Sequence, residues 1–558
     1  MKLARRRHVP VAICAAALAG AILPASAPAQ ASPTAAPAAR QVAAPVPKLD
    51  WRSCGAELER FLCATAQVPT DYDRPHGAKT RIALTKLPAS GDPDQRLGTL
   101  FTNPGGPGGS GVDFVQDGAA LIYAPEVLAR YDVLGFDPRG VARSDPATCF
   151  PTAEEELTFL LREPPYPLPG PQEPRFIRDT VELAARCQTM SPRRLSTAST
   201  ANVARDMDLL RQAVGDERLA YAGYSYGTYL GATYARLFPD RVGRFVLDGT
   251  LDPVAYSGTG RGNAAPTTPL GIRLRQGIGA TETFAEFARL CREAGPQRCS
   301  LAALGDPAVV VPATFDRLAR EPLEIPLPDG TTAVITQQVA VVMTFLDLYS
   351  PAGWPALADV LAAFAAPVPS PARVAAAVAQ TRSPLGARMR GEDYPSIGGG
   401  MASVCVDTAA SGRVHEYPAL IDAHDAEAPY FGRFRGWVGL PCEFWRLRDP
   451  DAFHGPWQQR TKAPVLVIGT RFDPATPYRQ SRPYADLFPD GRLLTLDGWG
   501  HTAIGKSVCV DAAIARYLVG GKPPPDGAVC APDAVPFTAP PAARGAPRPD
   551  VPPGLPLR

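Results

Sequence analysis

Short apolar runs alternate with helical patterns over much of this chain. From Lys79 onward, the stretches RIALTKLPA, GTLFTNP and YDVLGFDPRG each join a strand-like run to a terminating turn. The next segment, ANVARDMDLLRQAVG, has apolar residues at helical spacing and ends at a glycine. A strand, a helix and a strand then follow in RLAYAGYS, YLGATYARLFPDRV and GRFVLDGTLDP. This alternation predicts an α/β fold, a mostly parallel sheet flanked by helices.

The alternation stops between Pro253 and Trp457. Helical patterns such as ETFAEFARLCREAG and PALADVLAAFAA, joined by Pro- and Gly-rich segments, predict a large helical insertion, or lid, over 253–457. The strand-then-loop pattern returns in APVLVIGTRFDPATP and GRLLTLDGWGHTAI. We therefore expect one core in two parts, 49–252 and 458–532.

Both ends of the chain differ in composition from the middle. The basic start MKLARRRHVP, an apolar stretch and small residues with Ala-x-Ala spacing predict a secretory signal peptide over 1–31, cleaved after Ala27, Ala29 or Ala31. An uncleaved anchor is the alternative, but the apolar part is short for a membrane span, so we expect a secreted protein without stable membrane insertion. The Pro- and Ala-rich segments 32–48 and 533–558 predict a flexible or removable pro-segment and a disordered tail.

The composition indicates an oxidising environment and argues against nucleic-acid partners. The formal net charge is +2 and basic residues are scattered, so we expect no nucleic-acid binding. Beyond Cys14 the cysteine count is even, which favours disulfides in an exported chain. No Cys-x-x-Cys occurs and the histidines do not cluster with thiols, so a zinc site is the weaker alternative and no metal is expected. Connectivity does not follow from sequence; pairing neighbours, on the basis of loop closure, gives Cys54 with Cys63, Cys149 with Cys187, Cys291 with Cys299, Cys405 with Cys442, and Cys509 with Cys530.

The motif Gly223-Tyr224-Ser225-Tyr226-Gly227 carries the first candidate for chemistry. With 50 glycines in the chain the motif alone is weak evidence, and a turn or N-cap serine is the alternative. Its context is specific, because the strand RLAYAGY precedes it and a helix follows, as a nucleophile elbow requires. The two glycines would leave room for strand and helix to approach, so that Ser225 can occupy a strained turn.

A serine hydroxyl needs a base, which in turn needs a carboxylate to orient it. In this topology the chain order is serine, acid, histidine, with the last two on loops after late strands. His501 follows the strand GRLLTL, whereas the other histidines lie outside the late strand ends. Asp473 follows the strand APVLVIG and is the expected acid, with Asp248 and Asp497 as alternatives; Thr476, in the same turn, could orient the carboxylate.

Acyl transfer also needs backbone donors for the oxyanion. The loop FTNPGGPGGSG follows an early strand, where this fold places one donor. We expect the N–H groups of Gly106 and Tyr226 to form the oxyanion hole. A phosphate-binding loop is disfavoured because the Gly-Lys-Ser/Thr ending is missing, and a flexible surface loop is the remaining alternative.

Five motifs in order, NPGGPGGSG, DPRGVARSD, GYSYGTYLG, PVLVIGTRFDPATP and GHTAI, resemble those of the secreted tripeptidyl aminopeptidases of actinobacteria. These are relatives of the prolyl aminopeptidases in the alpha/beta-hydrolase class. The resemblance implies an alpha/beta-hydrolase fold, peptide substrates, release of tripeptides and no cofactor. Prolyl enzymes carry a His-Gly-Gly-Pro-Gly loop, and Pro104 stands here in place of that histidine, which fits the tripeptidyl group better and weakens any transfer of proline specificity.

Together these features predict a secreted serine exopeptidase that removes short peptides from free N-termini through an acyl-enzyme. Ser225 would attack, His501 would carry the proton and Asp473 would orient the imidazole. The lid carboxylates Asp407 and Glu443 are candidates for binding the substrate amine. An esterase or lipase-like hydrolase is the alternative enzyme, and a pseudo-hydrolase binding protein is the alternative without catalysis.

Overall fold

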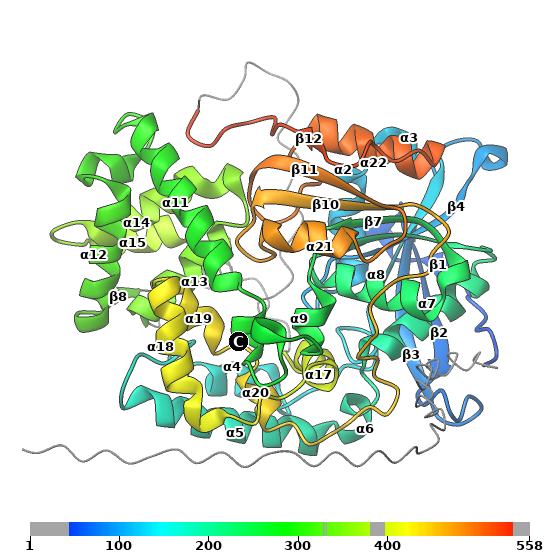
Figure 1. Cartoon of the computed structure of the whole chain (residues 1–558), viewed down its shortest axis with the longest axis horizontal. Coiled ribbons are helices and arrows are strands. Elements are labelled where there is room, and N and C mark those ends of the chain that lie inside the picture. The colour runs from blue at the N-terminus through cyan, green and yellow to red at the C-terminus, as the bar shows by residue number, and fades with distance from the viewer. Residues whose placement is uncertain (1–43, 327–329, 331, 380–396, 539–558) are drawn as a thin grey trace, which may run out of the picture. The chain divides into compact units, whose positions relative to one another are not determined.

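A ten-stranded sheet, counted over the described residues, unites the two parts of the chain that show the alternating pattern (Figure 1). The computed structural model describes residues 44–326, 330, 332–379 and 397–538. The predicted signal peptide and residues 539–558 of the predicted tail lie outside them. In spatial order, the strands are β1 (Arg52–Ser53), β2 (Leu62–Pro69), β3 (Lys79–Leu87), β5 (Tyr131–Phe136), β4 (Gly98–Asn103), β6 (Leu219–Tyr224), β7 (Val242–Asp248), β10 (Val465–Phe472), β11 (Gly491–Trp499) and β12 (Ala528–Cys530).

The sheet is parallel from β5 through β12, and antiparallel where β1, β2 and β3 extend it beyond β5. Successive side chains of a strand point to opposite faces, so each central strand is apolar on both sides. In β4, Leu100 packs in one core with α22 (Val508–Gly520), whereas Phe101 packs in another with α7 (Thr200–Ala213) and α8 (Tyr226–Leu237). Figure 1 shows α22 on one side of β10 and β11 and α21 (Ser481–Ala485) on the other. The predicted fold class is confirmed.

Between β7 and β10 the chain leaves the sheet and forms a helical insertion, although the two strands pair directly with each other. The insertion has its own apolar core, in which Phe287 packs edge-on against Trp354. A two-stranded hairpin of β8 (Leu323–Pro326) and β9 (Thr332–Ile335) accompanies the helices. These helices are α9 (Pro253–Ser257), α10 (Leu270–Arg273), α11 (Gln276–Ala294), α12 (Pro307–Arg320), α13 (Gln337–Asp347), α14 (Trp354–Ala365), α15 (Pro371–Val378), α17 (Gly398–Asp407), α18 (Tyr417–Glu427), α19 (Phe431–Gly436) and α20 (Leu440–Glu443).

A second helical segment, which the sequence analysis did not distinguish, lies between β5 and α7. It comprises α4 (Ala153–Leu160), α5 (Gln172–Met190) and α6 (Pro192–Leu195). Helix α5 packs against α20 of the insertion, and Glu173 on α5 pairs with Arg433 on α19 at 3.0 Å. The helical part of the molecule therefore draws on two separate stretches of sequence.

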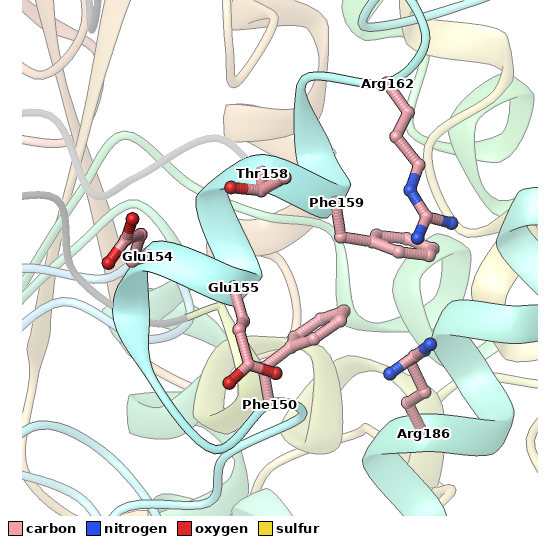
Figure 2. Close-up of a pocket in the computed structure, with 7 residues that line it drawn as sticks. All are labelled: Phe150, Glu154, Glu155, Thr158, Phe159, Arg162 and Arg186. Atoms are coloured by element: carbon pink, nitrogen blue, oxygen red, sulfur yellow. The ribbon is translucent and has the colours of Figure 1, made fainter.

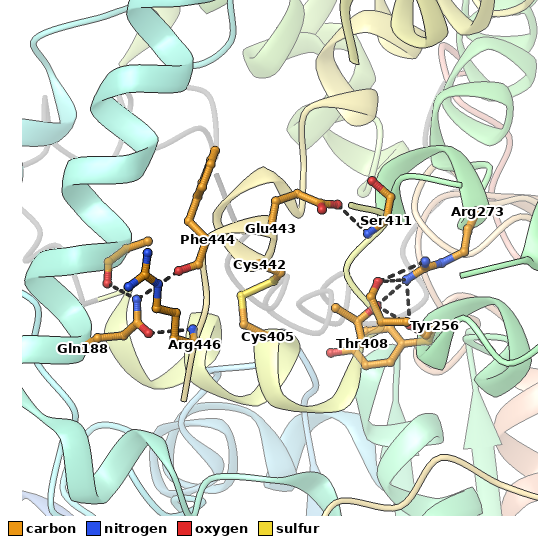
Figure 3. The surroundings of a disulfide bond; sticks show 12 residues. Gln188, Tyr256, Arg273, Cys405, Thr408, Ser411, Cys442, Glu443, Phe444 and Arg446 are labelled. Atoms are coloured by element: carbon orange, nitrogen blue, oxygen red, sulfur yellow. Dashed lines mark hydrogen bonds between the residues drawn. A yellow bond between two sulfur atoms is a disulfide. The ribbon is translucent and has the colours of Figure 1, made fainter. Parts of the chain in front are cut away.

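The ten cysteines beyond the signal region are joined as neighbours in sequence. The bridges are Cys54–Cys63, Cys149–Cys187, Cys291–Cys299, Cys405–Cys442 and Cys509–Cys530. The Cys405–Cys442 bridge links α17 to α20 (Figure 3). Over the part of the chain that the structure describes, no helix is both long and apolar enough to cross a bilayer.

Candidate active site

Ser225 lies at the sharp turn between β6 and α8. Its φ of 56° and ψ of −124° fall in a region that non-glycine residues seldom adopt, and such strain is concentrated at functional sites. A Cβ at Gly223 would lie 2.4 Å from the Gly227 carbonyl oxygen, and a Cβ at Gly227 would lie 2.7 Å from the Asn103 carbonyl oxygen. Both positions therefore need glycine, because the turn brings strand and helix into backbone contact.

His501 and Asp473 lie together on the loops after β11 and β10. His501 Nδ1 is 3.0 Å from each carboxylate oxygen of Asp473, and both side chains are buried. The Tyr349 carbonyl accepts a hydrogen bond from the His501 backbone N–H at 2.9 Å, and the Tyr349 ring lies edge-on to the imidazole. His501 is therefore held by the insertion, through Tyr349, as well as by the loop that carries Asp473.

The Asp473 carboxylate is held by more than the histidine. It accepts hydrogen bonds from the backbone N–H groups of Ala475, Thr476 and Thr502 at 2.8, 2.9 and 3.2 Å, and from the Thr476 hydroxyl at 2.9 Å. Burial alone would raise the pKa of Asp473, but His501 and these backbone donors outweigh it and hold the pKa below its usual 3.8. The ionised form is favoured, as the orienting acid of a triad requires.

The two alternative acids lie in other surroundings. Asp248 accepts hydrogen bonds from the backbone N–H groups of Ala503 and Ile504, and burial raises its pKa to about 6. Asp497 is exposed and pairs with Arg471 at 2.7 Å. Of the three carboxylates, Asp473 is the one that contacts the His501 ring.

The end of β7 connects the serine to the histidine. The Ser225 N–H donates to the Asp248 carbonyl at 3.0 Å, and a Cβ at the next residue, Gly249, would lie 3.4 Å from His501 Cε1. Within the described residues no hydrogen bond joins the Ser225 side chain to the imidazole. Such contacts are often loose without substrate and tighten in the reacting complex.

The glycine-rich loop after β4 lies against the elbow. A Cβ at Gly105, whose φ is 94°, would lie 2.9 Å from both Ser225 Cβ and the Tyr226 nitrogen. Tyr226 is the first residue of α8, so its N–H has no partner within the helix. Gly106 and Tyr226 line a cavity together with Ser225, as an oxyanion hole for this serine requires.

This cavity, of about 50 Å³, is bounded by both the sheet loops and the insertion. Aliphatic and aromatic residues make up most of its lining, although polar and apolar atoms share its surface about equally, and no Asp or Glu is among the described residues that line it. The lining residues are Gly106, Pro107, Ser225, Tyr226, Leu251, Tyr256, Leu270, Leu274, Gln276, Tyr349, Val404, Arg435, Val438, Ala475 and Thr476.

The two carboxylates expected to bind a substrate amine are outside this lining, and both are engaged elsewhere. Glu443 accepts a hydrogen bond from the backbone N–H of Ser411 (Figure 3). It also accepts from the backbone N–H of Gly412 and from the Tyr417 hydroxyl. Asp407 is fully buried and accepts from the N–H and hydroxyl of Thr200. Burial raises the pKa of Asp407 to about 8, which favours its neutral form. Both carboxylates therefore already have hydrogen-bond partners from other segments of the chain.

Four polar residues of the cavity were missed by sequence reasoning. They come from the insertion, where no motif marks them, and are Tyr256, Gln276, Tyr349 and Arg435. Arg435 belongs to FGRFRGWVG, which differs from the surrounding helical patterns only by two closely spaced arginines.

A larger cavity of about 250 Å³ lies elsewhere, between α4 and α5 (Figure 2). Phe150 and Phe159 line it, and the guanidinium carbons of Arg162 and Arg186 lie 4.6 to 5.7 Å from the centroids of these rings. Both arginines also pair with Glu182. The stacked and paired side chains satisfy one another, so we assign no function to this cavity. Among the described residues, His, Cys, Asp and Glu form no group of three or more suited to holding a metal.

Comparison with known proteins agrees with this geometry. Residues 98–272 match the family model "alpha/beta hydrolase fold", and residues 428–530 match the model "TAP-like protein". The chain is 34% identical to serine protease Hip1 of Mycobacterium tuberculosis, covering 87% of this chain and 92% of Hip1. It is 32% identical to carboxylesterase B of the same organism, covering 88% and 91% of the two chains. It is 27% identical to a tripeptidyl aminopeptidase of Streptomyces lividans, covering 88% and 87%. The predicted resemblance is confirmed, and the chain belongs to the alpha/beta-hydrolase family of serine hydrolases that includes Hip1 and the tripeptidyl aminopeptidases.

Proposed function

We propose that this protein is a secreted serine exopeptidase that removes short peptides, three residues long, from free N-termini. The observation that carries the proposal is the single cavity where Ser225 meets both oxyanion donors under the helical insertion. Relatives named serine protease and tripeptidyl aminopeptidase, which match nearly the whole chain, support peptide substrates. The five disulfides are compatible with secretion.

The chemistry follows from the placement of the five groups. Ser225 Oγ attacks the scissile carbonyl while His501 Nε2 takes its proton, and the oxyanion accepts hydrogen bonds from the N–H groups of Gly106 and Tyr226. The C–N bond then breaks, and the leaving amine takes the proton from His501. Water, activated by the same imidazole, hydrolyses the acyl-enzyme and regenerates the serine. Throughout, Asp473 holds the Nδ1–H, so that Nε2 remains the nitrogen available to Ser225.

Exopeptidase selectivity is proposed from the part that the insertion takes in the cavity. Leu270, Val404 and Val438 of the insertion line the same space of about 50 Å³ as Ser225, and we infer that the insertion limits how much chain fits before the scissile bond. Because this lining has no Asp or Glu, a free α-amine must find its partners in backbone carbonyls or beyond the cavity. Asp407 and Glu443 are not among these lining residues, so the proposal does not rely on an ion pair between either carboxylate and the amine.

Matched substrates test the proposal. Tripeptidyl substrates with a free amine should be hydrolysed faster than their acetylated counterparts, and longer peptides should release tripeptides. Ser225→Ala, measured in parallel, gives the background from contaminating peptidases. Equal rates on free and acetylated substrates, or cleavage at internal bonds without regard to the N-terminus, would remove the exopeptidase assignment and leave an endopeptidase.

The apolar lining also favours a second candidate function, hydrolysis of esters. Aliphatic and aromatic side chains dominate the cavity, and carboxylesterase B is a relative of similar coverage. The same acyl-enzyme steps cleave an ester, whose alkoxide leaving group takes the proton. Short-chain esters that are hydrolysed faster than every peptide, with no dependence on an N-terminal amine, would replace the peptidase assignment with this one.

A further inference from the structure

Arg435 brings a buried positive charge into the cavity that holds Ser225. It lies on α19, lines the cavity and is 5% exposed. Burial lowers its pKa to about 10, so the guanidinium remains charged at neutral pH. A buried cation normally has an anionic partner, because desolvating an unpaired charge is expensive.

The partners of Arg435 are neutral. Its Nε and Nη2 donate to the amide oxygen of Gln276, the Nε bond measuring 3.0 Å. Its guanidinium carbon lies 5.0 Å from the ring centroids of Phe345 and Phe434. Nη1 is buried and has no hydrogen-bond partner, and no ion pair of Arg435 occurs within the described residues. One donor nitrogen of Arg435 therefore lacks a hydrogen-bond acceptor, and its positive charge lacks an anionic partner within the described residues.

Two other buried arginines show how a buried guanidinium ordinarily finds its partners. Arg433, on the same helix, pairs with Glu173, Asp422 and Asp425. Arg273 also has its pKa lowered by burial to about 10, but it donates to a threonine hydroxyl and to several backbone carbonyls from all three of its nitrogens. Neither lines the cavity. Of these three arginines, Arg435 is the one with an unpartnered nitrogen, and it is the one that lines the cavity with Ser225.

Arg435 is held in a fixed place relative to the catalytic loop. The Gln276 amide nitrogen donates to the Ala475 carbonyl at 2.8 Å, while the Ala475 N–H donates to Asp473. A Cβ at Gly271 would lie 1.9 Å from the Arg435 carbonyl oxygen, so α10 and α19 are in backbone contact. Arg435 is thus anchored through Gln276 to the turn that carries the acid.

We propose that Arg435 is a subsite for a carboxylate of the substrate, bound close to the bond that Ser225 attacks. This inference rests on the proposed peptidase function and specifies its substrate class. The carboxylate comes either from an Asp or Glu side chain next to the scissile bond or from a free C-terminus one or two residues beyond it. Tyr256, whose buried hydroxyl lines the same cavity without a partner, supplies a second, neutral donor.

Paired substrates distinguish the two sources. One series carries Asp or Glu, against Asn or Gln, at each of the two positions flanking the scissile bond; another keeps a neutral sequence and has a free or amidated C-terminus. For the productive source, kcat/KM should be on the order of tenfold to a hundredfold higher for the anionic member, as expected for a charge-assisted hydrogen bond to a desolvated arginine. The position that shows the preference identifies the source.

Variants assign the effect to Arg435. Arg435→Gln should abolish the ratio between anionic and neutral members, and Arg435→Lys should retain part of it, because a lysine keeps the charge without the planar fork. Arg273→Gln is the matched control, since it also removes a buried guanidinium, one that does not itself line the cavity. The readout is a ratio of two rates on one preparation, so partial unfolding of a variant does not alter it.

Binding separates this inference from the function on which it rests. Affinities of the same peptides for Ser225→Ala, with and without Arg435→Gln, are measured by calorimetry. If the rates of hydrolysis and the affinities are the same for anionic and neutral peptides, the subsite is overturned and the peptidase function stands. A carboxylate preference in binding that needs Arg435, without any peptide hydrolysis by the intact protein, supports the subsite and overturns the peptidase. A preference that survives in Arg435→Gln also overturns the subsite.

Discussion

The two sides of the cavity around Ser225 are built from different kinds of structure. On the sheet side, strand ends and tight turns supply backbone N–H groups and the side chains of Ser225, Asp473 and His501, which follow β6, β10 and β11. On the insertion side, packed helices supply side chains alone, among them Leu270, Val404 and Arg435. Changes on the sheet side should therefore slow every substrate, whereas changes on the insertion side should alter the ratio between substrates.

The strongest test of the sheet side is removal of the nucleophile. Ser225→Ala should lower turnover on all substrates by about 10⁶-fold, as loss of the serine does in other triads. The residue adopts a positive φ whether or not it carries a hydroxyl, so the fold should persist. Hydrolysis assays measure the loss of turnover, labelling by a fluorophosphonate tests the nucleophile, and thermal unfolding tests whether the fold persists. Near-normal activity in a folded, uncontaminated variant would falsify the nucleophile.

The next largest effect should come from the acid. Asp473→Asn should reduce turnover by about 10⁴-fold, because an amide no longer selects the imidazole tautomer that leaves Nε2 free. Asp497→Asn is the control, since that carboxylate is exposed and pairs with Arg471; its turnover should stay within a few-fold of the wild type. A reversed order of the two variants would show that the observed contact with His501 is not the catalytic one.

The third test compares the stability of the two sides. Replacing Cys405 and Cys442 by alanine opens a loop with a sequence separation of 37 in the insertion and should lower the free energy of unfolding by about 3 to 4 kcal/mol. Replacing Cys54 and Cys63 opens a loop of 9 beside the edge of the sheet and should lower it by about 2 to 3 kcal/mol. Denaturant unfolding gives both values. The variant without Cys54 and Cys63 should keep its kcat on neutral substrates, whereas the variant without Cys405 and Cys442 should change the ratio of rates between substrates. That outcome would sharpen the division between the two sides.

The smallest effect concerns Asp248, which supports the loop after His501 without touching the ring. Its folded pKa of about 6 lies above the ordinary 3.8, so this group favours the folded state most below pH 4 and loses that contribution as the pH rises to about 6. Asp248→Asn cannot titrate. The stability of the wild type minus that of the variant should therefore fall by about 2 to 3 kcal/mol between pH 4 and 7. Thermal unfolding across this range measures it, and a difference that stays constant with pH would contradict the raised pKa of Asp248.

Sequence patterns predicted the sheet side far better than the insertion. The order of strands and helices, the elbow at Ser225 and the turn at Asp473 all depend on residues within a few positions of one another, so local patterns reveal them. Choosing Asp473 over Asp248 already needed the topological rule that the acid follows a late strand. The expected amine ligands Asp407 and Glu443 had no local pattern behind them, and the structure places both among other partners.

Local patterns predicted the fold class and the residues that end each central strand, because strand, turn and helix propensities act over short distances, and the resemblance of five motifs indicated the family. The partners of the buried charges could be read from the folded structure but not from these patterns. Arg433 and Arg435 are two positions apart on one helix, yet the first meets three carboxylates and the second meets an amide and two aromatic rings. Apart from the adjacent ring of Phe434, these partners come from other helices, α5, α11, α13 and α18. The energy of a buried charge depends on the partners that packing brings to it.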